Sequence, residues 1–296
     1  MTVTASPPAV VALHGFTGSG AAFGDAVNGL LGADSTGHDS VGRTPGHGPT
    51  TTRSPDLPGH GTAEAYRQAT CFEDVSAQLA LDIAGRCGYG VDLVGYSMGG
   101  RLALHLACTQ PGLVGRLVLI SACPGIEDEN KRSSRRFSDE QLAVSLETDG
   151  IEVFVEHWEA LPLFAGIARL DAGVRSELDR QRIACDAAGL ALALRCMGTG
   201  SQPWLGNWLA GLDLPVLLIA GSEDEKYATI ARQMHDLIPR ARLAIIDNSG
   251  HCPHLEQPQV VGAQLQAFLG PRRAPARPPR GSQQDPCTTE QRRARQ

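Results

Sequence analysis

The stretch DLVGYSMGGRLALHL, residues 92–106, joins an apolar run to a helical pattern through one serine set between glycines. The apolar residues before Ser97 indicate a buried strand, and the spacing of the apolar residues after it indicates a helix. Gly95, Ser97 and Gly99 form a G-x-S-x-G pattern at the junction. In this context the pattern predicts a sharp turn that presents the serine hydroxyl at the carboxyl end of a sheet.

Other apolar runs indicate further strands, at residues 9–15, 116–121, 215–221 and 242–247. Short continuous runs separated by amphipathic segments are typical of a parallel sheet that helices cover on both faces. Apolar residues at helical spacing, followed by glycine, predict covering helices at residues 72–88 and 256–270. The sequence therefore predicts an α/β fold with a mostly parallel central sheet.

The strand pattern stops between residues 124 and 208, where the chain predicts helices at 138–150, 151–161, 176–187 and 189–198. Ser138 followed by Glu140 and Gln141 indicates a helix start, and Gly150 indicates a helix end. A helical insertion between two core strands predicts a cap over one end of the sheet. We expect core segments at 1–123 and 209–270, with the cap at 124–208 between them.

Two segments do not resemble folded structure. Residues 35–55 are rich in Gly, Pro, Thr and His, which predicts a loop insertion. Residues 271–296 hold seven arginines and five prolines against two acidic residues and almost no apolar side chains. Such a segment cannot bury enough surface to offset the entropy of ordering it, so we expect a disordered basic tail.

The overall composition excludes several classes of protein. The formal net charge of -6 argues against nucleic acid as a partner. No apolar run approaches the roughly 20 residues that cross a bilayer, and residues 1–10 lack the pattern of a signal peptide, so we expect a cytoplasmic protein. The eight cysteines include no C-x-x-C pair, which favours reduced packing residues over disulfides or metal ligands.

A serine hydroxyl becomes a useful nucleophile or base when a histidine accepts its proton and a carboxylate orients that histidine. Asp224 follows the strand at 215–221 at the interval typical of the acid, with Glu223 and Glu225 as competitors. His251 lies on the loop after the strand at 242–247, and His254 is its rival. We expect Ser97, Asp224 and His251 to form the catalytic triad.

Backbone N–H groups that face the serine could stabilise negative charge on a substrate oxygen. The loop after the first strand and the turn after Ser97 are the expected sources, so we expect the N–H groups of Phe16 and Met98 to form an oxyanion hole. We expect His14 and Gly15 to shape the first of these loops.

Arginines near the serine indicate the chemical class of the substrate. Arg101 lies one helical turn after Ser97, so it can face the same pocket. The predicted cap carries more arginines in KRSSRRF, residues 131–137, and SELDRQR, residues 176–182. Because a guanidinium matches the geometry of a carboxylate, arginines around an apolar pocket predict a small molecule with several carboxylates.

The chain resembles a known family along residues 9–269, apart from the 35–55 loop. The resemblance rests on the runs LHGFTGSGAAF, DLPGHG, GYSMGGRLAL, RSSRRFSDEQLA, HWEALPLF, GLALALRCMGTGSQPW, AGSEDEKY and SGHCPHLEQP. Together they are similar to the 2-succinyl-6-hydroxy-2,4-cyclohexadiene-1-carboxylate synthases of menaquinone biosynthesis, within the α/β-hydrolase superfamily.

The resemblance implies a lyase that removes a ring proton from a tricarboxylate and eliminates pyruvate, with the serine as base and with no metal or organic cofactor. It implies the same triad and oxyanion donors, and it adds a set of substrate-binding residues. This set comprises Tyr96, Arg101, Arg135, Trp158 and Arg182, where helix register leaves Arg132, Arg136 and Arg180 as rivals.

The segment TTTRSP before DLPGHG departs from the family pattern, which has an apolar strand there, so the strand is either degenerate or replaced by the loop. Two other functions remain open. One is a hydrolase of esters, thioesters or C–C bonds on the same fold, and the other is a catalytically silent ligand-binding protein. The sequence leaves the oligomeric state open.

Overall fold

The computed structural model describes residues 9–32, 52–61 and 70–270. Within these ranges a parallel sheet of six strands has the order β2-β1-β3-β4-β5-β6. The strands are β1 (Val10–Leu13), β2 (Thr52–Arg53), β3 (Val91–Tyr96), β4 (Val114–Ile120), β5 (Val216–Gly221) and β6 (Ala241–Ile246). The predicted fold class is confirmed, because each apolar run predicted as a strand contributes one.

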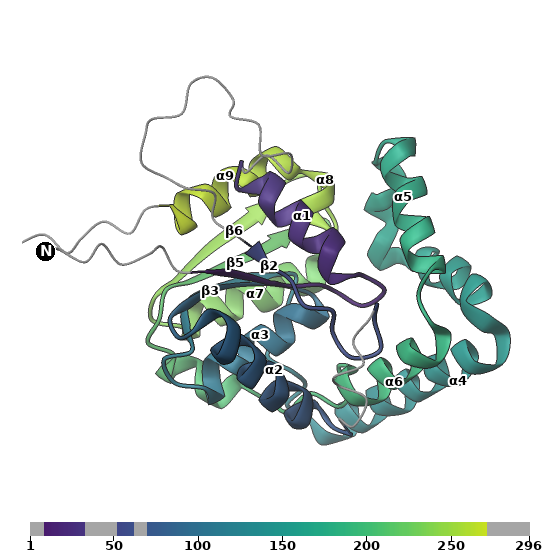
Figure 1. The fold of residues 1–296 in the computed structure, drawn as a ribbon, viewed down its shortest axis with the longest axis horizontal. Coiled ribbons are helices and arrows are strands. Elements are labelled where there is room, and N and C mark those ends of the chain that lie inside the picture. The colour runs from purple at the N-terminus through teal and green to yellow at the C-terminus, as the bar shows by residue number, and fades with distance from the viewer. Residues whose placement is uncertain (1–8, 33–51, 62–69, 271–296) are drawn as a thin grey trace, which may run out of the picture.

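Helices cover both faces of this sheet (Figure 1). Two of them, α1 (Gly20–Leu30) and α9 (Pro258–Leu269), pack together on one face. The other face is covered by α2 (Phe72–Cys87), α3 (Met98–Thr109) and α7 (Glu225–Leu237). Two short elements, η3 (Gly206–Gly211) and α8 (Pro253–Glu256), lie in the connections. The helices predicted at 72–88 and 256–270 correspond to α2 and to α8 with α9.

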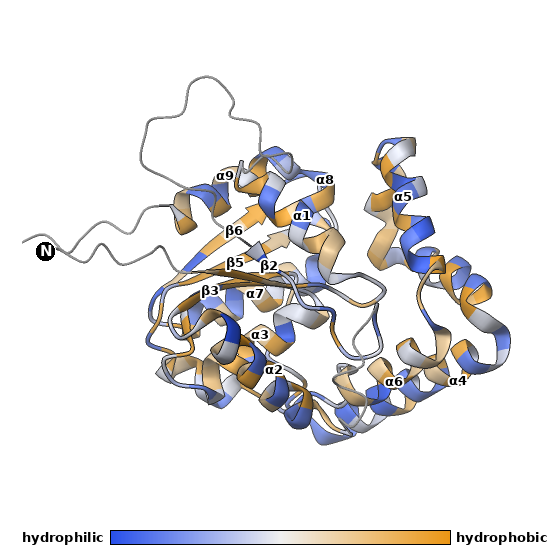
Figure 2. Ribbon diagram, in the orientation of Figure 1, coloured by the Kyte–Doolittle hydropathy of each residue, from blue (hydrophilic) through white to orange (hydrophobic). Residues whose placement is uncertain are grey.

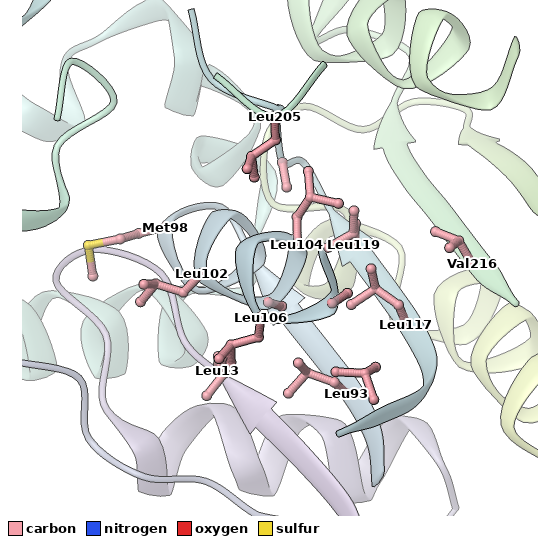
Figure 3. Close-up of a cluster of buried hydrophobic side chains, with 14 of the residues drawn as sticks. Leu13, Leu93, Met98, Leu102, Leu104, Leu106, Leu117, Leu119, Leu205 and Val216 are labelled. Carbon is pink, nitrogen blue, oxygen red and sulfur yellow. The ribbon is translucent and has the colours of Figure 1, made fainter. Parts of the chain in front are cut away.

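Alternating side chains of the strands form one apolar core on each face. Leu93 and Leu117 pack with the α3 side, and Val94 and Val118 pack with the α1 side. The reason is that successive side chains of a strand point to opposite faces of a sheet. Figure 3 shows Leu102 and Leu106 of α3 among leucines of the strands. The central strands are accordingly hydrophobic in Figure 2, whereas the covering helices carry mixed colours.

A helical cap is inserted between β4 and β5 and lies beside the sheet (Figure 1). It consists of α4 (Glu129–Glu159), η2 (Pro162–Arg169), α5 (Ala172–Ile183) and α6 (Ala187–Met197). Gly150 interrupts α4 with φ 85°, as predicted for a helix end. The predicted start at Ser138 is wrong: α4 begins after Asp128, whose side chain caps Lys131 N, and the Ser138 hydroxyl donates to the Ser134 carbonyl within the helix.

The cap has its own apolar contacts and also touches the core. Leu146 and Phe154 of α4 pack against Leu190 and Leu194 of α6, with Phe16 of the core at the edge of this cluster. α4 and α6 thus form one unit, and Phe16 links it to the loop after β1.

The structure differs from the predicted loop at the C-terminal end of the 35–55 segment. Thr52 and Arg53 form β2, which pairs in parallel with Val10 and Val11 of β1, so the predicted loop is wrong at this end. The strand is therefore degenerate rather than replaced: it keeps its place in the sheet with two residues. Residues 35–51 and the predicted tail at 271–296 lie outside the described residues.

The described residues also bear on two expectations from composition. Their seven cysteines form no disulfide with one another, and Cys287 lies outside the described ranges. None of the helices in these ranges combines the length and apolar character that crossing a membrane requires.

Candidate active site

Ser97 occupies a strained turn between β3 and α3. Its backbone has φ 50° and ψ -108°, a conformation that L-residues rarely adopt and that functional sites often contain. The turn also requires glycines around it: a Cβ on Gly99 would lie 2.2 Å from the Leu13 carbonyl oxygen, and one on Gly95 would lie 2.6 Å from the Gly100 Cα. The sequence pattern G-x-S-x-G-G therefore reflects close backbone packing.

The structure brings Ser97, His251 and Asp224 into one hydrogen-bonded chain. The Ser97 Oγ lies 3.1 Å from His251 Nε2, and His251 Nδ1 lies 2.6 Å from Asp224 Oδ2. The Tyr227 N–H donates to Asp224 Oδ1 at 3.2 Å, so both carboxylate oxygens are held. His251 and Asp224 are buried while the serine is partly open, an arrangement that can move a proton between the hydroxyl and the imidazole.

The competing acids and the rival histidine lie elsewhere. Glu223 is exposed and pairs with Arg169, and Glu225 is exposed at the start of α7. His254 is buried with its ring 4.4 Å from the Tyr96 ring, and burial lowers its pKa to about 3. His254 has no hydrogen bond to Ser97 among the described residues, so the geometry favours His251.

Aromatic rings surround the imidazole of His251. The ring of Tyr227 lies at 4.6 Å, and the rings of Tyr96 and Phe164 lie at 5.7 and 5.9 Å. The Tyr96 hydroxyl is 2.9 Å from the Cys252 Sγ, and burial raises the pKa of that thiol to about 12. Cys252 therefore packs against Tyr96 and also bonds its hydroxyl.

The predicted oxyanion donors are the backbone N–H groups of Phe16 and Met98. In the described ranges, neither the Phe16 N–H nor the Met98 N–H has an acceptor. Met98 is the first residue of α3, where the helix dipole favours negative charge. Thr17 next to Phe16 has φ 62°, so the loop is held in an uncommon conformation. Both amides remain available for an oxygen beside Ser97.

A cavity of about 390 Å³ opens beside Ser97, in the range typical of small-molecule sites. Its wall is mainly aromatic and apolar, with the predicted residues Phe16, Tyr96, Trp158 and Arg182 on it. The Trp158 ring contacts Phe16 at 5.3 Å and Phe164 at 5.3 Å. Cap and core side chains therefore enclose this cavity together.

Arg182 is the single arginine of the described chain that borders the cavity. It is only 6% exposed, its guanidinium lies 5.8 Å from the centre of the Phe164 ring, and it pairs with Glu159 at 2.5 Å. This buried cation could exchange Glu159 for a carboxylate in the cavity.

Arg101 and Arg135 were also expected to line the substrate pocket, but neither residue borders this cavity. Arg101 is buried and donates to the Met197 carbonyl at 2.7 Å, at the negative end of α6. Arg135 pairs with Asp139, one helical turn along α4. Both nevertheless act electrostatically on the Tyr227 phenol, whose ring contacts the His251 ring.

The rival arginines do not border the cavity and pair with acidic residues of their own helices. Arg132 and Arg136 both pair with Glu129, and Arg136 also donates to the Gly200 carbonyl. Arg180 is exposed and pairs with Glu177. Of the competing pair on α5, the structure thus places Arg182 at the cavity.

Sequence reasoning missed two features of the site. His60 from the DLPGHG run accepts a hydrogen bond from Thr17 N, and Glu256 accepts from the amides of Gly250 and Cys252. The signal for Glu256 was its place five residues after His251 in HCPHLE. No local pattern indicates the His60 bond, because Thr17 lies 43 positions away in the chain.

Comparisons with known proteins find relatives over most of the chain. Residues 10–264 match the alpha/beta hydrolase family. The chain is 38% identical over 262 residues to a Bacillus subtilis (strain 168) protein that provisionally bears the name 2-succinyl-6-hydroxy-2,4-cyclohexadiene-1-carboxylate synthase, covering 88% of this chain and 90% of that protein. It is 34% identical over 215 residues to the synthase of that name from Enterobacter sp. (strain 638), covering 72% of this chain and 80% of that one.

A solved structure shows the same relationship in three dimensions. MenH from S. aureus aligns with a TM-score of 0.77 and 31% identity, over 90% of this chain and 95% of that one. The chain therefore belongs to the alpha/beta hydrolase family and, within it, to the 2-succinyl-6-hydroxy-2,4-cyclohexadiene-1-carboxylate synthase family.

Proposed function

We propose that this protein is a pyruvate-eliminating lyase of menaquinone biosynthesis. Its substrate would be 2-succinyl-5-enolpyruvyl-6-hydroxy-3-cyclohexene-1-carboxylate, and its product 2-succinyl-6-hydroxy-2,4-cyclohexadiene-1-carboxylate. The observation that carries the chemistry is the 3.1 Å contact between Ser97 Oγ and His251 Nε2 at the wall of an aromatic cavity. Family membership favours this reaction over the others that a triad can perform.

In the proposed reaction Ser97 acts as a base. Its hydroxyl proton passes to His251 Nε2, and its oxygen takes a proton from the substrate ring. The electron pair left on the ring forms the new double bond, and the C–O bond to the enolpyruvyl group breaks. The leaving enolpyruvate takes up a proton and becomes pyruvate. Asp224 stabilises the imidazolium that forms, so the relay consists of side chains alone and requires no metal or organic cofactor.

The amides of Phe16 and Met98 would stabilise the negative charge that spreads from the ring onto a substrate carbonyl oxygen. Neither has an acceptor among the described residues, and Met98 adds the dipole of α3. Each such donor can lower a barrier by about 2.7–4 kcal/mol.

The three carboxylates of the substrate would be shared among Arg182, Arg101 and Arg135. We propose that Arg182 binds one of them inside the cavity by displacing Glu159, between Trp158 and Tyr96. For Arg101 and Arg135, which do not border the cavity, this role requires the substrate to extend beyond it toward Tyr227. Each would exchange a protein partner for a substrate carboxylate.

The decisive test is incubation of the purified protein with the enolpyruvyl substrate, with pyruvate measured through a coupled lactate dehydrogenase assay. We expect stoichiometric pyruvate release by the wild type and none above background with Ser97→Ala. A p-nitrophenyl ester of a neutral acid serves as the comparison substrate and should be a poor one.

Two outcomes favour the other functions. Rapid ester turnover with an acylated Ser97, and no pyruvate, would make the protein a hydrolase. Tight binding of the substrate by wild type and by Ser97→Ala alike, with no turnover of either compound, would make it a ligand-binding protein. We also propose a cytoplasmic location, which fractionation of cells would check.

A further inference from the structure

The carboxylate of Glu256 holds the backbone on both sides of His251. Its Oε2 accepts from the Gly250 N–H at 2.9 Å, and its Oε1 accepts from the Cys252 N–H at 3.1 Å. The side chain is only 4% exposed. A single buried carboxylate therefore holds the Ser249–Gly250 and His251–Cys252 peptide units, which bracket His251 on its loop.

The same carboxylate is bonded to the cap. Arg169, the last residue of η2, donates through Nη2 to Glu256 Oε2 at 3.1 Å and to Glu223 Oε2 at 2.6 Å. Glu223 directly precedes Asp224, and its N–H donates to the Ser249 carbonyl at 2.9 Å. One guanidinium of the cap thus joins the loop that carries the acid and the loop that carries the histidine.

η2 makes a second contact with Glu256, through its backbone at Gly166. A Cβ on Gly166 would lie 1.9 Å from Glu256 Oε2, so the backbone of the cap packs directly on the carboxylate. Gly166 and Arg169 lie on the same short helix. A shift of this helix would therefore move a contact of Glu256 as well as its ion pair.

We propose that Glu256 and Arg169 are positioning residues that couple the cap to the catalytic geometry of His251. A buried carboxylate requires its full set of donors, and Arg169 is its single cationic partner among the described residues. Without Arg169 the two amides alone hold Glu256, and the His251 loop gains freedom. A misplacement of about 1 Å at a reacting group can cost about 10²-fold in rate.

This proposal rests on the proposed role of His251, whichever reaction the triad performs. The test compares Arg169→Gln, Arg169→Lys and Glu256→Gln in the full-length protein. Arg86→Gln is the matched control, because Arg86 forms an exposed ion pair with Asp82 on α2, far from the triad. We expect Arg169→Gln to lower kcat about 10-fold and Glu256→Gln about 10–100-fold, with KM changed less than about twofold. Arg169→Lys should restore most of kcat, and Arg86→Gln should match the wild type.

A spectroscopic measurement makes the test independent of the reaction. The His251 Nδ1–H, 2.6 Å from Asp224, should give a low-field proton resonance in the wild type and in Arg86→Gln. It should broaden or move upfield in Arg169→Gln and Glu256→Gln. Failure of the wild type to release pyruvate would refute the proposed function. The resonance would still show whether Arg169 and Glu256 position His251.

Two results would overturn the coupling. One is an Arg169→Gln variant whose resonance and kcat equal those of the wild type. The other is an equal loss of kcat in Arg169→Gln and Arg169→Lys that follows an equal fall in Tm, which would give Arg169 a role in folding alone.

Discussion

His14 and His60 each hold the loop on which the other lies. His14 Nε2 accepts from the Leu57 N–H at 3.0 Å, and His60 Nε2 accepts from the Thr17 N–H at 3.2 Å. Their rings are 4.9 Å apart and both are buried. Because both bonds need an unprotonated nitrogen, the loop that presents the Phe16 N–H depends on two neutral imidazoles.

This pair makes stability depend on pH. Burial lowers the pKa of His14 to about 4 and that of His60 to about 3, below the ordinary value of 6.5. Between pH 6.5 and 4 these two histidines are protonated in the unfolded chain but stay neutral in the folded chain. The free energy of unfolding therefore falls as pH falls. Each histidine should contribute up to about 1.4 kcal/mol per pH unit.

Urea unfolding at pH 7.5 and 5.0 measures this loss. His60→Gln, which keeps an oxygen that can accept the Thr17 N–H, should make the loss smaller. His157→Gln on the exposed side of α4 is the control and should behave as the wild type. If the free energy of unfolding depended on pH equally in His60→Gln and the wild type, His60 would not be a cause of the loss.

Asp224→Asn should leave the fold intact and remove most of the activity. The amide can accept from Tyr227 N, but it no longer stabilises an imidazolium and it disfavours the tautomer with Nδ1–H. We expect kcat for pyruvate release to fall about 10³–10⁴-fold with KM little changed. Glu223→Gln, next in the chain and exposed, should lose far less.

Arg182→Ala tests recognition of a carboxylate in the cavity. A hydrogen bond to a charged group contributes about 1.5–3 kcal/mol, so kcat/KM for the tricarboxylate should fall about 10–150-fold. Turnover of a neutral p-nitrophenyl ester should change little. Arg195→Ala is the control, because Arg195 pairs with Glu140 and Glu147 within the cap. Equal losses on both substrates would assign Arg182 to packing instead.

Arg101→Ala should lower stability as well as activity, which distinguishes it from Arg182→Ala. The buried guanidinium satisfies the Met197 carbonyl, and loss of that donor should cost about 1–3 kcal/mol of unfolding free energy. Chemical unfolding measures this cost, and kcat/KM for the tricarboxylate measures the proposed binding role. An unchanged kcat/KM in folded Arg101→Ala would remove this residue from the binding set.

Two glycine substitutions should have opposite effects. Gly99→Ala places a Cβ 2.2 Å from the Leu13 carbonyl oxygen, so the turn at Ser97 must shift and both folding and activity should suffer. Gly29→Ala, inside α1 with open space around it, should stabilise the protein by about 0.5–1 kcal/mol. Thermal unfolding and pyruvate release would measure both, and a tolerated Gly99→Ala would refute the argument from close packing.

The central fold and the contacts of the triad could be predicted from sequence because their signals are local. The apolar runs become β1 and β3 to β6, and the acid and the histidine each follow such a run directly. Parallel strands end at the same edge of a sheet, so residues after their carboxyl ends meet. The geometry at Ser97, Asp224 and His251 follows from this topology.

Side-chain destinations could not be predicted in the same way. Helical spacing placed Arg101 near Ser97, but its guanidinium is taken by the Met197 carbonyl, 96 positions away in the chain. Two residues at β2 are too few to show an alternating pattern. Ser138 resembled a cap, yet its hydroxyl donates to a carbonyl within α4. Only the Arg101 difference comes from a tertiary contact; the other two come from a pattern too short to recognise and from a serine that bonds within its own helix.

The brevity of β2 has a consequence beyond the site. In the described part of the chain the sheet ends at this strand, where two residues are paired with β1. A long unpaired strand edge can recruit a strand from another molecule and start aggregation, whereas a very short one offers little to recruit. At this end of the sheet, the shortened strand thereby discourages adhesion between copies of the protein.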